Sequence, residues 1–188
     1  MGLRGILGIT GTPGTGKKSV APIVARALGV PCVGLNDAAG PLGVMTRNRR
    51  WAEVDTARLR AVLPRHLARP SVVYGHLLPY SLGRRDVEHV VVLRCEPSVL
   101  KQRLGSRGYS EAKMLANVEA ELIGATYADA LRAFGRKTVE EDTTYLTPDE
   151  AAAEVLSIAM DRRPSAAPIE WMRNYDTPQK LRSLLPSF

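Results

Sequence analysis

The stretch GTPGTGKKS, residues 11–19, lies between a short apolar run, residues 3–9, and a segment with helical character, residues 17–28. Its glycines allow consecutive backbone N–H groups to curve around an anion, and the amino end of the following helix adds positive potential. The alternative is a glycine turn that only closes a βα unit, but such a nest of amides has little use without an anion. The order of strand, loop and helix therefore predicts a loop that binds the phosphates of a nucleotide.

The residue that follows the loop lysine is unusual. Lys17 is expected to reach the outer phosphates, and the motif normally continues with a Ser or Thr whose hydroxyl binds the magnesium ion of the nucleotide. Here Lys18 takes that place and Ser19 follows it. Because a protonated lysine cannot ligate a cation, the sequence leaves the handling of magnesium open.

The composition limits the kind of protein. A chain of 188 residues with 45% hydrophobic content suits one compact domain, and its apolar runs are too short to cross a bilayer, so we expect a cytoplasmic protein without a membrane partner. Cys32 and Cys95 lie in apolar runs without the spacing of a zinc site or redox pair, which indicates buried thiols. The net charge of +7 favours a polyanionic partner, and both ATP and RNA fit that description.

Strand and helix signals alternate after the loop. This alternation predicts an α/β fold of the P-loop NTPase class, a five-stranded parallel sheet flanked by helices. The expected strands are residues 3–9, 31–35, 71–75, 89–94 and 137–141, and the expected helices are residues 17–28, 55–67, 98–104, 111–134 and 148–160. Gly105 and Gly108 follow the expected helix of residues 98–104, and we expect this helix to end there in a mobile loop.

The chain divides into a P-loop core, residues 1–162, and a linker with a C-terminal tail, residues 163–188. Prolines and small residues mark the linker. The tail is too short to fold alone, and its apolar residues, which include Trp171, predict that it docks on the core.

Further motifs follow the loop in a fixed order. They are Gly75-His76, Arg103-Leu104 with Arg107-Gly108-Tyr109, Asn117-Val118-Glu119-Ala120-Glu121, and Asp142-Thr143-Thr144. Together with the loop they resemble the nucleoside monophosphate kinases, and among these the adenylate kinase isoenzyme 6 family. The resemblance covers about residues 3–160 and leaves out the tail.

This resemblance implies a small atypical adenylate kinase, nucleoside monophosphate kinase-like in fold, which converts ATP and AMP to two ADP and hydrolyses ATP. It also implies a role in small ribosomal subunit maturation, with a small-subunit ribosomal protein and rRNA as partners. The acceptor-nucleotide region would span about residues 36–58 and the lid about residues 106–116. The ATP-binding residues would be Gly14, Gly16, Lys17, Lys18, Ser19 and Arg107, and the catalytic residues Lys17, His76 and Arg107.

Each proposed role has a plainer alternative. Arg107 would stabilise the transferred phosphoryl group together with Lys17, and its alternative is a solvated surface arginine. His76 would position water or a phosphate oxygen at the carboxyl edge of the sheet, and its alternative is a core-edge histidine satisfied by backbone. The polar side chains of the third of these motifs are expected on a solvated helix face without a catalytic role: Asn117, Glu119 and Glu121.

Two departures from the family both concern magnesium, which remains the expected cofactor. One is Lys18, and the other is Tyr74, which stands two residues before His76 where the family often has an acidic residue. Either Lys18 replaces part of the metal's charge at the β-phosphate, or another side chain takes over ligation, with three candidates: Ser19, Asp37 and Asp86.

Two other functions stay open. One is another small-molecule kinase of the same architecture, because the acceptor pocket is the least legible part of the sequence. The other is a ribosome or RNA assembly factor in which the nucleotide acts as a conformational switch with little turnover. The net positive charge and the altered metal positions favour this second alternative.

Overall fold

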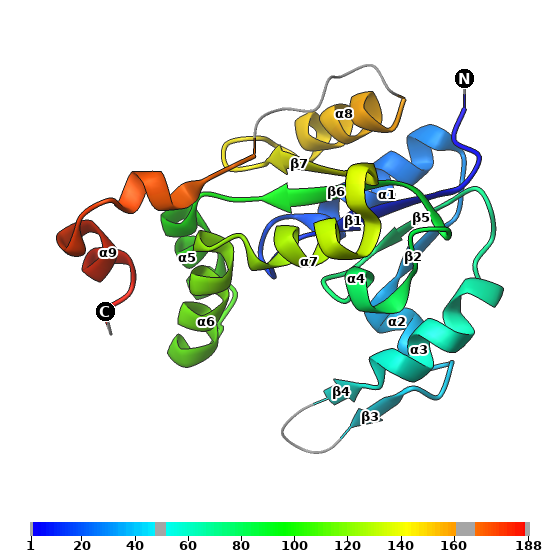
Figure 1. Ribbon diagram of the computed structural model, residues 1–188, viewed down its shortest axis with the longest axis horizontal. Coiled ribbons are helices and arrows are strands. Elements are labelled where there is room, and N and C mark those ends of the chain that lie inside the picture. The colour runs from blue at the N-terminus through cyan, green and yellow to red at the C-terminus, as the bar shows by residue number, and fades with distance from the viewer. Residues whose placement is uncertain (1, 48–51, 161–167, 187–188) are drawn as a thin grey trace.

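A computed structural model describes residues 2–47, 52–160 and 168–186. Its centre is a five-stranded parallel sheet with the order β2-β5-β1-β6-β7 (Figure 1). The strands are β1 (Ile6–Thr10), β2 (Cys32–Gly34), β5 (Ser71–Tyr74), β6 (Val87–Arg94) and β7 (Thr138–Asp142). The predicted α/β fold and its five parallel strands are therefore confirmed.

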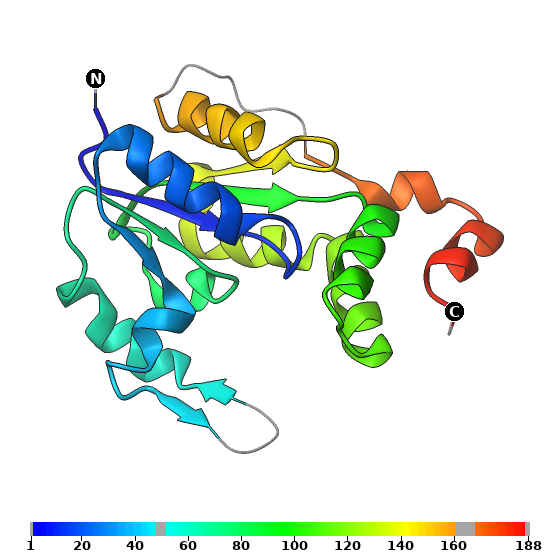
Figure 2. The ribbon, with the colours of Figure 1, turned by 180° about the vertical axis from the view of Figure 1, so that it is seen from behind.

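Helices cover both faces of this sheet, which is why its central strands are apolar on both sides. One face carries α1 (Lys17–Leu28) and α8 (Pro148–Ala159), packed through Val24 and Val155 (Figure 2). The other face carries α3 (Thr56–Val62), α4 (Leu78–Ser81) and α7 (Ala125–Phe134), packed through Leu59, Leu78 and Phe134. Thr147 caps α8 with a reciprocal hydrogen bond to Glu150, and Pro148 opens the helix.

A third apolar cluster lies beside the sheet. It joins α5 (Pro97–Ser106) and α6 (Glu111–Leu122) to the C-terminal segment, residues 168–186, which contains the short helices η3 (Trp171–Tyr175) and α9 (Pro178–Leu184). Figure 1 shows this segment lying along the α5/α6 hairpin. The tail thus docks on the core, whereas residues 163–167 of the predicted linker lie outside the described residues.

The region between β2 and β5 holds α2 (Leu35–Ala39) and a separate hairpin of β3 (Met45–Arg47) and β4 (Ala52–Val54), which the sequence did not reveal. The hairpin projects away from the sheet (Figure 1). After α3 the chain continues as a single 3₁₀ turn, Leu63–Arg65, because Pro64 cannot supply a helical N–H.

Three details differ from the sequence-based expectations. The single helix expected over residues 111–134 is two helices, because Gly124 adopts φ +68° and turns the chain between α6 and α7. Helix α5 runs through Gly105 and stops before Gly108, which has φ +71°. Cys32 is exposed because β2 is an edge strand, whereas Cys95 is buried as expected. Every helix in the described ranges is too short or too polar to span a bilayer.

Candidate active site

The loop between β1 and α1 forms an open nest at the carboxyl edge of the sheet. Helix α1 begins with Gly16 at its N-cap position, with no side-chain cap and no acidic residue in its first turn. The Ser19 amide donates to the Gly16 carbonyl oxygen at 2.9 Å, and no side chain caps the amides before it, which carry the positive end of the helix dipole. Gly16 has φ +102°, and a Cβ built there would meet only a Val20 methyl, at 3.9 Å, so no side chain crowds this end of the loop.

Gly14 fixes the position of the loop against α5. It has φ +101°, and a Cβ there would lie 2.6 Å from a methyl of Leu100 and 3.0 Å from one of Leu104. A larger residue would force the two leucine side chains or the loop itself to move. The loop and the helix that leads to Arg107 are therefore packed directly together.

The side chain of Lys17 lies across the loop. Its Nζ donates to the carbonyl oxygens of Gly11, at 2.6 Å, and Thr12, at 2.9 Å. Burial lowers the pKa of Lys17 to about 7; the carboxylate of Glu121 opposes this fall and the guanidinium of Arg107 adds to it. An anion bound in the nest would favour the charged ammonium, so this lysine is poised to exchange backbone carbonyls for phosphate oxygens.

A cavity of about 670 Å³ opens above this loop. It brings together residues from five separate segments: the loop, the β2–α2 junction, the β5–α4 junction, the α5/α6 hairpin and α7. The predicted site residues that line it are Gly14, Gly16, Lys17, Lys18, Ser19, His76 and Arg107. Sequence-distant positions thus converge on the glycine-rich loop.

A second cavity, of about 230 Å³, shares the loop with the first. Gly14, Gly16, Ser19 and Arg107 line both cavities. The remaining wall comes from the end of α5 and the β7–α8 connection: Arg103, Ser106, Thr143, Leu146, Thr147, Pro148 and Ala151, with Thr15 and Val20. The phosphate nest therefore lies at the junction of a large cavity and a smaller, partly apolar one.

His76 faces the large cavity just beyond β5. Gly75, with φ +156°, lets the chain pass so close to Leu35 that a Cβ would meet the leucine Cβ at 2.9 Å. The imidazole is exposed to the cleft, yet desolvation, followed by the charges of Lys17 and Lys113, lowers its pKa. The lowered pKa favours the neutral imidazole, which can both donate and accept a hydrogen bond.

Two cations approach the loop from the α5/α6 hairpin. Arg107 follows the last turn of α5, where its backbone N–H donates to the Leu104 carbonyl oxygen at 3.1 Å, and its side chain is exposed. Lys113, at the start of α6, lies 5.0 Å from the ring centroid of Tyr109. Both line the large cavity, so the predicted lid region supplies positive charge toward the phosphate nest.

Of the three candidate magnesium ligands, two lie near the loop and one lies far from it. Lys18, Ser19 and Asp37 line the large cavity. The Asp37 carboxylate and the Tyr74 hydroxyl converge, since a Cβ on Gly34 would lie 2.5 Å from the carboxylate oxygen and 2.9 Å from the phenol oxygen. Tyr74 stands where the family often has an acidic residue, and here the carboxylate of Asp37 lies beside its hydroxyl.

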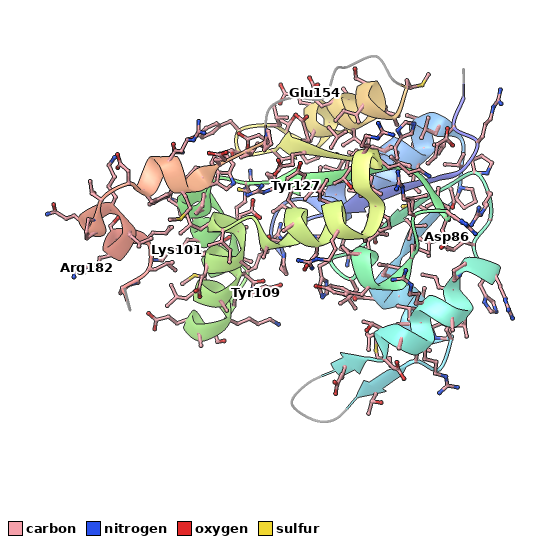
Figure 3. The ribbon with its side chains drawn as sticks, in the orientation of Figure 1. Asp86, Lys101, Tyr109, Tyr127, Glu154 and Arg182 are labelled. Carbon is pink, nitrogen blue, oxygen red and sulfur yellow. The ribbon has the colours of Figure 1, made fainter. Side chains whose placement is uncertain are left out.

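Asp86, the third candidate, is excluded as a ligand. It precedes β6 at the amino edge of the parallel sheet, opposite the loop (Figure 3). Its carboxylate accepts hydrogen bonds from Arg69 at 3.1 Å and from the Gly83 amide at 2.8 Å. Within the described ranges no three His, Cys, Asp or Glu residues form a metal-binding group.

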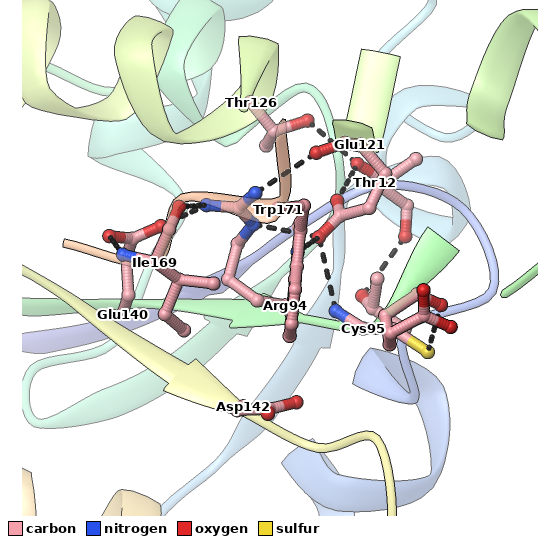
Figure 4. A network of polar contacts seen from close by, with 12 residues as sticks. Thr12, Arg94, Cys95, Glu121, Thr126, Glu140, Asp142, Ile169 and Trp171 are labelled. Atoms are coloured by element: carbon pink, nitrogen blue, oxygen red, sulfur yellow. Dashed lines mark hydrogen bonds and ion pairs between the residues drawn. The ribbon is translucent and has the colours of Figure 1, made fainter. Parts of the chain in front are cut away.

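The expectation that Glu121 faces solvent is wrong. Its side chain is 1% exposed and accepts hydrogen bonds from the Thr12 hydroxyl at 2.5 Å, the Arg94 Nε at 2.7 Å and the Cys95 amide at 3.0 Å (Figure 4). Helical spacing indicates this burial, because Glu121 follows the buried Val118 by three positions and so lies on the same face of α6. Of its two companions, Glu119 is exposed as expected and Asn117 lines the large cavity.

Solved structures with a similar fold include two small-molecule kinases. A gluconokinase from Sinorhizobium meliloti 1021 superposes with a TM-score of 0.55 at 21% identity, covering 86% of this chain and 94% of its own. A shikimate kinase from Acinetobacter baumannii gives a TM-score of 0.58 at 14% identity, covering 86% and 95%. At these identities the likeness shows the fold alone.

Sequence relatives are closer. A family model described as an AAA domain matches residues 7–124. A protein named "Putative adenylate kinase" from Thermococcus kodakarensis is 34% identical over 175 residues, covering 91% of this chain and 95% of its own, and one of the same name from Halobacterium salinarum is 35% identical over 170 residues, covering 87% and 95%. Since 91% of 188 residues is about 171, the similarity reaches past residue 160 into the C-terminal segment. The chain therefore belongs to the P-loop family that these archaeal adenylate kinase-like proteins form.

Proposed function

We propose that this protein is a nucleoside monophosphate kinase that transfers the γ-phosphoryl group of ATP to AMP. The observation that carries the proposal is the position of the phosphate nest, with Lys17 and Arg107, at the junction of two cavities. A donor and an acceptor that occupy one cavity each would meet at their phosphates. The names of the archaeal relatives support the same reaction.

The smaller cavity fits the base of the donor nucleotide. Leu146, Pro148 and Ala151 give it an apolar wall, and Arg103 is held across it by hydrogen bonds from one guanidinium nitrogen to the carbonyl oxygens of Thr143 and Thr144. A planar guanidinium above an apolar floor suits a purine ring. ATP bound there would place its phosphates on the loop.

The larger cavity fits the acceptor. Beyond the loop it is lined by polar side chains from α2, the β5–α4 junction and α7: Asn36, Asp37, Tyr74, Tyr80 and Asp129. These groups can hydrogen bond the ribose hydroxyls and the exocyclic amine of AMP. His76 would orient the AMP phosphate toward the donor.

In the transfer, a phosphate oxygen of AMP attacks the γ-phosphorus while the bond from that phosphorus to the β–γ bridging oxygen breaks, which leaves two ADP. Such a reaction needs alignment and charge neutralisation more than covalent help. Lys17 and Arg107 supply positive charge on either side of the transferred group. Closure of the lid region, residues 106–116, over the loop would exclude water and so limit hydrolysis of ATP.

Magnesium is the proposed cofactor, and it would offset the charge of the bound phosphates. The residues present fit a weakly held ion, because Mg²⁺ usually keeps several waters and takes one or two protein oxygens beside the phosphates. The Ser19 hydroxyl and the Asp37 carboxylate would provide them. Lys18 would add a fixed charge at the β-phosphate.

Two other functions have an observation in their favour. The carboxylates of Asp37 and Asp129 in the acceptor cavity suit a polyhydroxyl acceptor, as in another small-molecule kinase. The net charge of +7 and the lysine at position 18 favour a nucleotide-switched assembly factor with rRNA and a small-subunit ribosomal protein as partners and with little turnover. A ribosome maturation role is compatible with the kinase as well.

The test compares AMP-dependent ADP formation with plain ATP hydrolysis in the purified protein. The kinase predicts ADP formation that requires AMP and exceeds hydrolysis by about 10² or more. The same assay with shikimate, gluconate and other nucleoside monophosphates identifies a different acceptor. Hydrolysis that responds to rRNA and not to any acceptor would instead support the assembly factor.

A further inference from the structure

A buried ion cluster, Arg94 with Glu121 and Glu140, connects the phosphate loop to the C-terminal segment (Figure 4). The three side chains are between 1% and 4% exposed. Arg94 bonds Glu121 through Nε at 2.7 Å and also contacts Glu140 through its guanidinium. Nothing in the reaction outlined above uses this cluster.

The cluster reaches the loop through Thr12. The Thr12 hydroxyl donates to Glu121 at 2.5 Å, while the Thr12 carbonyl oxygen accepts from Lys17 at 2.9 Å and from the Thr15 hydroxyl at 3.0 Å. One residue therefore links the buried carboxylate to the lysine that meets the phosphates. A shift of Thr12 would move the lysine and the loop together.

The cluster is incomplete without the C-terminal segment. It holds two carboxylates against one guanidinium, so further donors are needed to compensate the second buried charge. The segment supplies one donor to each carboxylate: the Trp171 indole N–H to Glu121 at 3.2 Å, and the Ile169 amide to Glu140 at 3.0 Å. The Ile169 carbonyl oxygen accepts from Arg94 at 3.4 Å.

The same segment also holds α5, the helix that leads to Arg107. The Tyr175 hydroxyl donates to Glu96, whose carboxylate caps the amino end of α5, and Lys101 of α5 donates to the Leu184 carbonyl oxygen at 2.6 Å. Apolar contacts with Leu100 and Leu104 complete the attachment. None of these contacts involves the ion cluster, so a variant that removes one of them serves as a control for a variant that removes the Trp171 bond to Glu121.

We propose that Glu121 is a positioning residue for the phosphate loop and that the C-terminal segment, through Trp171, completes its anchorage and so sets nucleotide affinity. The role in affinity rests on the proposed nucleotide site. A segment that only finished the fold would change stability but would not be coupled to the loop. The difference is measurable as a coupling free energy between Trp171 and Thr12.

The test is a double-mutant cycle on ADP affinity, measured by calorimetry, with Thr12→Val and Trp171→Phe. We expect Thr12→Val to weaken ADP binding about tenfold and Trp171→Phe about fivefold, because each loses a hydrogen bond to a buried carboxylate. If both act through Glu121, the double variant loses only about tenfold rather than about fiftyfold. Thr12→Ser, which keeps the hydroxyl, should retain most of the affinity and leave the effect of Trp171→Phe unchanged.

Tyr175→Phe is the matched control, since it also removes one hydrogen bond between the segment and a carboxylate. Its effect should add to that of Thr12→Val. Additive effects of Trp171→Phe, or an equal coupling for Tyr175→Phe, would overturn the proposal.

A second measurement needs no nucleotide. In the free protein, Trp171→Phe should raise hydrogen exchange of the Thr15 amide, which donates to the Thr12 carbonyl oxygen at 3.2 Å, several-fold, while Tyr175→Phe leaves that amide unchanged. Unchanged exchange in Trp171→Phe would overturn the anchorage. Wild-type protein that fails to bind ADP would refute the nucleotide site alone, so the two failures are distinguishable.

Discussion

The donor and acceptor sides of the cleft differ in charge and in how firmly they are tied to the sheet. The donor side presents Lys17, Arg103 and Arg107 around the loop, and buried polar bonds anchor it, among them the Thr143 hydroxyl to the Thr15 carbonyl oxygen at 3.0 Å. The acceptor side carries the carboxylates of Asp37 and Asp129, and its hairpin attaches to the core through apolar packing.

This contrast separates two functions. A phosphoryl group in transfer gains most from fixed positive charge, so the donor side benefits from a rigid frame. Discrimination among acceptors depends on which hydroxyls and amines find a partner, so the acceptor side can change without disturbing the loop. Variants on the two sides should therefore affect different kinetic constants.

The largest effect is expected from the donor side. Lys17→Met removes the ammonium and keeps an apolar chain of similar length, and we expect kcat to fall about 10³-fold because the transferring group loses a preorganised charge. ADP formation with and without AMP measures it. Lys180→Met is the matched control, since Lys180 lies at the surface in a pair with Asp176 and should keep full activity. Comparable losses in the two variants would show that the effect is not local to the loop.

On the acceptor side, Asp129→Asn should change the KM for the acceptor and leave the affinity for ATP unchanged. Asp129 lines the large cavity and accepts hydrogen bonds from the Tyr80 hydroxyl and, at 2.8 Å, from Arg132. We expect KM for the acceptor to rise about tenfold, because the lost charge weakens a hydrogen bond to substrate, while ATP affinity stays constant. Steady-state kinetics with each substrate varied provide the measurement.

Asp176→Asn is the control for this variant, because Asp176 lies on the surface outside both cavities. If Asp129→Asn weakened ATP and acceptor equally, the two sides would not be separable and the contrast would fail.

The same contrast explains how much the sequence could predict. The loop is a local motif, so residues 11–19 and the alternating strands were enough to predict the sheet and the position of Lys17. Resemblance to a family added His76 and Arg107, which do line the cavity with it. The acceptor wall joins α2, the β5–α4 junction and α7, and only tertiary packing brings these segments together.

Glu121 and the turn at Gly124 show why the rest was not predicted. A charged residue on an amphipathic helix is normally solvated, and nothing local reveals that Arg94 will lie opposite it across the fold. Gly124 within a helical pattern is compatible with a continuous helix, and only its φ of +68° creates the separate helix α7 that bears Asp129. The first miss concerns partners far apart in the chain, and the second concerns one backbone torsion that the sequence pattern does not fix.

A smaller effect is expected on the pH dependence of ADP affinity, through Lys17 on the donor side. The pKa of Lys17 is lowered from 10.5 to about 7, first by burial, so in the free protein this lysine loses its proton as pH rises through 7. The unfolded chain keeps that proton up to about 10.5, so between these values Lys17 makes stability rise with pH. Bound phosphates favour the ammonium, and ADP binding should therefore take up a proton above pH 7.

We expect ADP affinity to fall about fivefold from pH 7 to pH 8, with proton uptake of about one half to one. Calorimetry at pH 8 in buffers of different ionisation enthalpy measures the uptake. Lys17→Met should abolish both effects, whereas Asp129→Asn should leave them intact. Equal uptake in wild type and Lys17→Met would assign the proton to another group.

The smallest expected effect lies at the second lysine of the loop. Lys18→Thr restores the hydroxyl that binds magnesium in other P-loop proteins, and we expect turnover at saturating magnesium to rise about threefold. Half-saturation should also occur at a lower magnesium concentration. Lys18→Met removes the charge without adding a hydroxyl, and it should lower ADP affinity without improving the response to magnesium. A rate for Lys18→Thr equal to that of wild type would mean that Ser19 and Asp37 already hold the ion. In that case Lys18 would contribute only positive charge to the donor side. The magnesium ion would then lie between the two sides, held by Ser19 of the loop and by the acidic Asp37 of the acceptor cavity.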